Sequence, residues 1–171
     1  MSSAKIVQEQ ETDLGQSQTM SHLTGLIVLS SCLIAAVTDF RYRKIYNAVT
    51  YPALGLLILI GLAETAGLLE GLTLVSPENA VLGFLFAAVL TGTAWYFGQL
   101  GGGDVKLALV IGLGFGWDYG FPALLFALLL SAVWAGVCML FRPAGNDRER
   151  KIPIPMGCCF FIATAAVFYF R

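Results

Sequence analysis

Long apolar stretches joined by short polar connections constrain the fold of this chain more than any other feature. They run approximately over residues 22–37, 48–69, 79–98, 105–117, 120–141 and 152–170. A helix needs about 20 apolar residues to cross about 30 Å of hydrocarbon, and several of these stretches are long enough. The mean hydropathy of +0.77 is too high for a soluble domain of 171 residues. We therefore expect an all-α polytopic membrane protein.

Positively charged residues predict the orientation of the chain. They cluster after the first apolar stretch and before the last one, at Arg41, Arg43, Lys44, Arg142, Arg148, Arg150 and Lys151. Short cytoplasmic loops collect Lys and Arg, so both clusters should face the cytoplasm. This requires an even number of crossings between them, which includes the short stretch 105–117. The pattern favours about six transmembrane helices, with the N-terminus external.

The first 21 residues differ from the rest. They are polar and lack apolar periodicity, so we expect a flexible N-terminal tail over residues 1–21 and a six-helix membrane domain over residues 22–171. The first apolar stretch has no basic segment before it and no small-residue cleavage site, which argues against a cleaved signal peptide.

The chain offers no convincing ligand set for a metal. Its cysteines (Cys32, Cys138, Cys158 and Cys159) lie inside apolar stretches without a Cys-x-x-Cys pair, and His22 is the one histidine. Zinc sites need several such ligands at suitable spacing. We expect packing roles for the cysteines, and neither a metal nor another cofactor.

Two aspartates, Asp39 and Asp104, lie at the ends of apolar stretches. Ionisable residues at a membrane boundary are costly and mark candidate functional sites. Two crossings separate the two residues, so both carboxylates should lie at the cytoplasmic boundary. Simpler roles remain open: Asp39 could pair with Arg41 in a polar loop, and both Asp104 and Asn47 could be helix N-caps.

A glycine triplet precedes the second aspartate, in Gly101-Gly102-Gly103-Asp104. Glycine permits close backbone approach and unusual dihedral angles, which would suit a peptide lying beside a catalytic group. The triplet lacks the spacing of a P-loop or a dinucleotide-binding fingerprint, so we expect neither nucleotide nor nucleic acid as a partner. Lys106 is expected to extend to the membrane boundary, and Gly112 and Gly116 form a small-xxx-small pair for helix packing.

Together these motifs resemble the type IV prepilin peptidases, membrane aspartyl proteases of the Gly-x-Gly-Asp class. The resemblance rests on Asp39 with its basic loop leading to Ile45 and Asn47, on residues 101–107, and on Lys151-Ile152-Pro153. Tyr46 stands where the family usually has proline, which affects the rigidity of the loop. The chain looks like the short, peptidase-only form found with tight-adherence (Flp) pili, and archaeal preflagellin peptidases are similar in design.

The resemblance implies a function. Asp39 and Asp104 would be the catalytic pair, with Gly101, Gly103, Lys106, Asn47 and Arg41 as supporting residues. Neighbouring carboxylates that share one proton can activate water and protonate a peptide carbonyl. The substrate would be a prepilin or pseudopilin precursor, cut at the inner-membrane boundary between a basic leader and an apolar helix. Membrane lipid and the pilus assembly machinery are further expected partners, and the oligomeric state stays open.

Other activities fit the sequence less well. The bifunctional members of the family carry two Cys-x-x-Cys pairs and a methyltransferase activity, which we do not expect here. A presenilin-like protease would need a Pro-Ala-Leu motif and a longer chain. A proton-coupled transporter or an assembly factor would use the two aspartates as a relay or as ion-pair partners, and a transporter would favour internal repeats.

Overall fold

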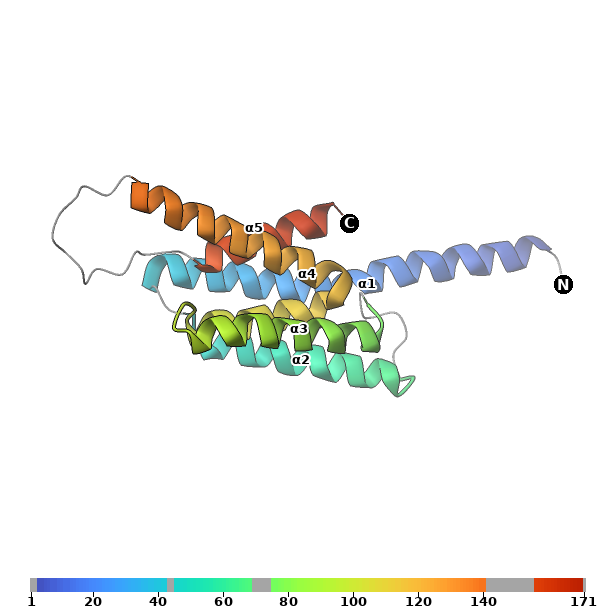
Figure 1. Ribbon diagram of the computed structural model, residues 1–171. Coiled ribbons are helices and arrows are strands. Elements are labelled where there is room, and N and C mark those ends of the chain that lie inside the picture. Colours follow the sequence, from blue (N-terminus) through green and yellow to red (C-terminus); the bar gives the residue numbers. More distant parts are fainter. Residues whose placement is uncertain (1–2, 43–44, 69–74, 141–155, 171) are drawn as a thin grey trace.

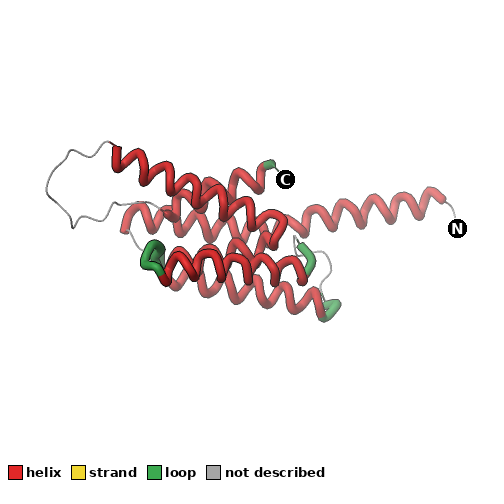
Figure 2. Tube along the Cα trace, in the orientation of Figure 1, coloured by secondary structure: helices red, strands yellow, loops and turns green. Residues whose placement is uncertain are grey.

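The computed structural model describes residues 3–42, 45–68, 75–140 and 156–170, without the side chains of residues 3–22 and Met139. Its helices are α1 (Ser3–Tyr42), α2 (Asn47–Thr65), α3 (Pro77–Tyr96), α4 (Gly102–Leu140) and α5 (Met156–Tyr169). Figure 2 shows helices joined by short connections and no strand in the described segments. The predicted all-α fold is confirmed.

Several of these helices are long and apolar enough to cross a membrane. They are residues Leu23–Tyr42 of α1, all of α2 and α3, and Gly102–Cys138 of α4. Helix α5 is apolar but has only 14 residues, which is about 21 Å of helix. The chain is therefore a polytopic membrane protein, while the number of crossings and the orientation stay predictions.

Helix α4 is two helical arms joined at Gly116. The backbone of Gly116 has φ 65° and ψ −164°, a conformation that glycine adopts readily. In Figure 1 the first arm runs beside α3, and the second arm returns toward the end of the bundle where α4 began. The sequence predicts a break over residues 114–122. The structure confines it to Gly116, since the second arm continues through Pro122.

Glycines let α3 and the first arm of α4 come into backbone contact. A Cβ atom added at Gly83 would lie 2.3 Å from the carbonyl oxygen of Gly112 and 2.4 Å from the carbonyl carbon of Gly116. The predicted packing role of Gly112 and Gly116 is thus confirmed. The side chain of Asn79 also donates a hydrogen bond to Asp118, which connects the start of α3 to the turn in α4.

The first arm of α4 forms the centre of the bundle. Helix α4 contacts α1, α2, α3 and α5, and residues on all sides of the first arm are buried, among them Leu107, Val110, Ile111 and Phe115. A helix that is apolar all round is stable only in such a buried position. This central arm begins with Asp104, so the packing of the whole bundle positions that carboxylate.

Some expected boundaries differ from the structure. Helix α1 continues to Tyr42, so Asp39 and Arg41 lie on a helix and not in a loop. It also begins at Ser3, so the segment expected as a tail is helical and projects beyond the bundle in Figure 1, while its flexibility stays a prediction. The basic residues Arg43 and Lys44, and residues 142–153 with the predicted Lys151-Ile152-Pro153 motif, lie outside the described part of the chain.

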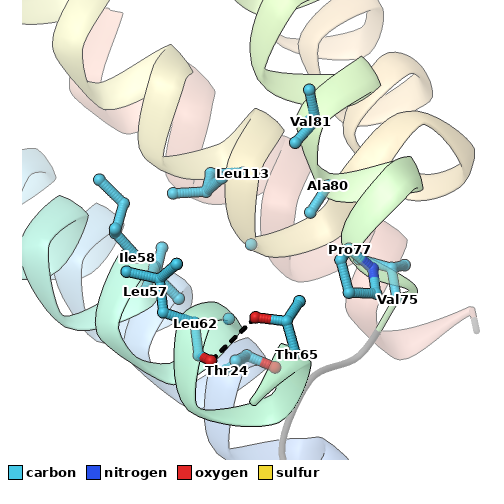
Figure 3. Close-up of a pocket in the computed structure, with 12 residues that line it drawn as sticks. Thr24, Leu57, Ile58, Leu62, Thr65, Val75, Pro77, Ala80, Val81 and Leu113 are labelled. Atoms are coloured by element: carbon cyan, nitrogen blue, oxygen red, sulfur yellow. Dashed lines mark hydrogen bonds between the residues drawn. The ribbon is translucent and has the colours of Figure 1, made fainter.

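An apolar cavity of about 240 Å³ lies far from both aspartates. Figure 3 shows its lining, which comes from the end of α2, the start of α3, the end of the first arm of α4 and Thr24 of α1. The hydroxyl of Thr65 beside it donates to the carbonyl oxygen of Leu62 at 2.8 Å, so this group is satisfied within its own helix. The lining is therefore mostly hydrocarbon, with Thr24 and Thr65 as its polar residues.

Candidate active site

Asp39 lies half-buried in the last turn of α1. One oxygen of its carboxylate accepts a hydrogen bond of 2.8 Å from the backbone N–H of Gly157. Gly157 belongs to the first turn of α5, where N–H groups have no acceptor inside the helix. The positive end of the α5 dipole also favours a carboxylate at this place. Helix α5 thus orients Asp39. The sequence suggests Arg41 as the partner of Asp39 and does not predict this contact with α5.

A glycine is needed at position 157 for this contact. A Cβ atom there would lie 3.0 Å from both the Cβ atom of Asp39 and the carbonyl oxygen of Ala35. An added side chain would require α5 or α1 to shift by a few tenths of an ångström, which would disturb the hydrogen bond to Asp39. The sequence analysis missed Gly157, although a single glycine at the start of the last apolar stretch is the kind of signal that marks close helix approach.

Replacing Gly157 by alanine is expected to lower the rate of the reaction at Asp39 roughly tenfold while the protein still folds. Small displacements of a catalytic group can cost this much or more. The rate is measured with the activity assay of the full-length protein, and membrane extraction checks that the variant is inserted in the membrane. Gly136→Ala is the matched control, because nothing lies within 4 Å of a Cβ atom at position 136. Equal rates for the two variants would remove Gly157 from the positioning of Asp39.

Asp104 lies in the first turn of α4, also half-buried. Its carboxylate accepts a hydrogen bond of 3.1 Å from the backbone N–H of Gly101, the residue just before the helix. Asp104 therefore reaches back to the start of its own helix from inside the first turn, and it is not the N-cap residue.

Of the two predicted properties of the motif glycines, close approach and unusual dihedral angles, the structure shows close approach. A Cβ atom at Gly101 would lie 2.9 Å from the Asp104 carboxylate, and one at Gly103 would lie 2.8 Å from the Cβ atom of Ile45. The positive φ in this region belongs instead to Gly98, which ends α3. Gly103 thus lets the connection between α1 and α2 lie directly on the first turn of α4, and Gly101 leaves room for the carboxylate.

These contacts place the two aspartates at the same end of the bundle. Asp39 on α1 and Asp104 on α4 lie at the same end of the bundle, and each carboxylate is within range of the other's charge. The hydrogen bond to Gly157 and the contact between Gly103 and Ile45 join the surrounding helices at this end. The arrangement is a pair of half-buried carboxylates, each oriented by one backbone N–H. Such a pair can share a proton and polarise a water molecule between them.

Lys106 joins α4 to α2 beside this pair. Its Nζ donates a hydrogen bond of 2.8 Å to Oδ1 of Asn47 and lies 4.6 Å from the centre of the Tyr51 ring. Asn47 is the first residue of α2, whose N-cap is Tyr46, so the expected N-cap role of Asn47 is wrong. Its side chain instead accepts the hydrogen bond from Lys106. Tyr51 was not anticipated, although it follows Asn47 by one helical turn.

We expect a double-mutant cycle of Lys106→Met and Asn47→Ala to give a coupling energy of roughly 1 kcal/mol. The hydrogen bond is partly exposed, so the value should not be much larger. Free energies of unfolding in mixed detergent micelles measure it. Lys106→Met and Glu78→Gln should have additive effects on the free energy of unfolding, because Glu78 lies in the first turn of α3, at the other end of the bundle from Lys106. A coupling near zero for the first pair would mean that the hydrogen bond does not hold α4 to α2.

Arg41 contacts the ring of Tyr42 rather than either aspartate. Its guanidinium lies 5.8 Å from the ring centre of Tyr42, on the exposed face of α1. Among the residues that the structure describes, no three metal-binding side chains gather at one point. The candidate site therefore consists of Asp39 and Asp104, oriented by Gly157 and Gly101, with Lys106 and Asn47 at its side.

Comparison with known proteins assigns the chain to a family. The model of the type IV leader peptidase family matches residues 26–136, a segment that includes both aspartates and the helices that carry them. The protein belongs to this family. The match ends before α5, so Gly157, which binds Asp39, lies beyond the segment on which the family assignment rests.

A curated member of the family is similar over most of this chain. It is the prepilin leader peptidase/N-methyltransferase of Bacillus subtilis (strain 168), 32% identical over 138 residues, which are 78% of this chain and 50% of the relative. The chain thus spans about half the length of this relative. No solved structure gives a significant match.

Proposed function

We propose that this type IV leader peptidase is an aspartyl endopeptidase that removes the leader from prepilin or pseudopilin precursors. The observation that carries the proposal is that Asp39 and Asp104, from two distant segments of the chain, lie at one end of the bundle, where the charge of Asp39 acts on Asp104. Family membership and the name of the Bacillus subtilis relative support the same substrate class. The proposal covers the peptidase activity and not N-methylation, because peptide hydrolysis by two carboxylates uses no methyl donor.

The proposed reaction needs one proton shared by the two carboxylates. The ionised carboxylate takes a proton from a water molecule, whose oxygen attacks the carbonyl carbon of the scissile bond. The protonated carboxyl group donates to the carbonyl oxygen, which gives a tetrahedral diol. The carboxyl group that took the proton from water then donates it to the amide nitrogen, while its ionised partner takes a proton from one hydroxyl of the diol. The C–N bond breaks, and a carboxyl group and an amine are released. No covalent intermediate with the enzyme forms.

The position of the pair at the end of the bundle suits this substrate. A prepilin-like precursor has a basic leader in water and an apolar helix in the bilayer, and the bond to be cut lies between them. The positive-inside rule favours the cytoplasmic side for this end of the bundle. Arg41 and Lys106 lie near the ends of their helices there, and the basic residues of segments 43–44 and 142–151 follow α1 and α4 in the sequence. We therefore propose a multi-pass protein of the cytoplasmic membrane with its site on the inner side.

Cleavage of a defined precursor tests the proposal. The full-length protein in detergent or vesicles is mixed with a prepilin-type probe, a Lys- and Arg-containing leader followed by an apolar helix of about 20 residues. Mass spectrometry should find a shortened product with a new, unmethylated amino terminus. A set of such probes that remains intact, while the protein is folded and inserted, would reject the peptidase and favour a proton relay as the role of the aspartates. The link to tight-adherence pili is tested by including a precursor from such a system.

A further inference from the structure

The outer surface of α1 and α5 contains two adjoining hollows. The first, about 470 Å³, lies beside the last turns of α1 and the start of α5, and the second, about 570 Å³, continues along both helices. We call the two together the α1–α5 groove. Its lining includes Leu26, Leu33, Val37, Phe40, Cys158 and Phe161.

The two hollows follow one another along the same faces of α1 and α5. On α1 the lining positions recur at three- and four-residue intervals from Leu26 to Arg41, which places them on one face of the helix. On α5 Cys158 and Phe161 lie one turn apart and connect the hollows. The path from Leu26 to Arg41 is about 22 Å long, which is most of the hydrocarbon thickness.

The groove leads to the candidate active site. Cys158 lines the groove, follows Gly157 in the chain, and is within range of the charge of Asp39. Its thiol also lies 3.9 Å from the carbonyl oxygen of Ala36, so the two helices are in contact at the floor of the groove. The apolar cavity of about 240 Å³, by contrast, lies at the end of α2 away from the aspartates. An apolar segment seated in the groove would therefore have one end next to Asp39.

We propose that the α1–α5 groove binds the apolar helix of the precursor and thereby presents the bond before that helix to Asp39 and Asp104. The inference rests on the proposed peptidase function, and it names the surface that recognises the membrane-embedded part of the substrate. The apolar lining matches such a helix, and the groove's length matches most of a membrane span. Arg41 marks the point where the apolar lining ends, so the leader begins there.

Filling the groove tests the proposal. Val37→Trp places an indole in the groove, two residues from Asp39, and Val89→Trp places one on α3, away from the groove. The two valines are similarly exposed, at 57% and 67%. The groove variant should raise KM for the probe about tenfold or more and change kcat less, since one misfitting group in an apolar site is worth roughly 10–200-fold. The control should match the wild type. Equal KM values for all three proteins would overturn the proposal.

Disulfide cross-linking provides a readout that does not depend on catalysis. Asp104→Asn protein retains Cys158, and the probe carries one cysteine in the first turn of its apolar helix. Oxidation should join the two chains, and Cys158→Ser should abolish the product. No Cys158-dependent product would overturn the groove even if the wild type cleaves the probe. A cross-link without any cleavage by the wild type would instead reject the peptidase function and leave the groove as a helix-binding surface.

Discussion

Asp39→Asn and Asp104→Asn are each expected to lower the rate of probe cleavage by about 100-fold or more. General acid–base catalysis contributes typically 10²–10⁴-fold, and an asparagine can neither take the proton from water nor donate an acidic one. The substitution keeps the size of the side chain. Its carbonyl oxygen can still accept the hydrogen bond from Gly157 or Gly101. The loss should therefore appear in kcat, with KM for the probe little changed.

A third aspartate serves as the matched control. Asp118 lies at the other end of the bundle, just after the turn at Gly116, and accepts a hydrogen bond from Asn79. Asp118→Asn makes the same chemical change away from the site, so its cleavage rate should stay within a few-fold of the wild type. Full activity of either Asp39→Asn or Asp104→Asn would remove that residue from the proposed pair. Equal losses in all three variants would point to a general effect on folding.

Gly83→Ala is expected to destabilise the protein by about 3 kcal/mol, at the upper end of the range for overpacked sites. The added methyl group would meet the backbone of Gly112 and Gly116, at 2.3–2.6 Å, and not the end of a flexible side chain. Helix α3 and the first arm of α4 must therefore separate. Because that arm begins with Asp104, we also expect slower cleavage in the molecules that remain folded.

Unfolding in mixed detergent micelles measures this loss, and Gly92→Ala is its control. Gly92 lies on the same helix, and nothing is found within 4 Å of a Cβ atom built there. Alanine has the better helix propensity, so the control should be as stable as the wild type or slightly more stable. If Gly83→Ala unfolds like Gly92→Ala, the close approach of α3 and α4 does not contribute to stability.

Much of the candidate site was predictable because its chemistry is local. Asp39 and Asp104 stand out in the sequence since carboxylates are rare beside apolar stretches. The two crossings expected between Asp39 and Asp104 are consistent with both carboxylates lying at one end of the bundle. Gly101 and Gly103 were singled out for close approach and unusual dihedral angles, and the structure shows close approach, to Asp104 and Ile45.

Other features could not be predicted, because they depend on which distant segments touch. Gly157 is 118 positions from Asp39, and no pattern near either residue indicates their hydrogen bond. Asn47 resembles an N-cap by its position before an apolar stretch. In the structure its side chain instead accepts a hydrogen bond from Lys106 of α4. The end of α1 was placed too early, because polar residues after position 38 resemble a loop when the packing of α5 beside them is unknown.

By itself the sequence determined that this protein is a bundle of membrane helices with two candidate carboxylates. Apolar length and the need to satisfy backbone hydrogen bonds in lipid are properties of each segment alone. The tertiary structure alone decided that the chain reverses at Gly116, that α5 orients Asp39, and that a groove between α1 and α5 leads to the site. These features arise from the close packing of helices against one another, which depends on pairs of surfaces and not on any single stretch of residues.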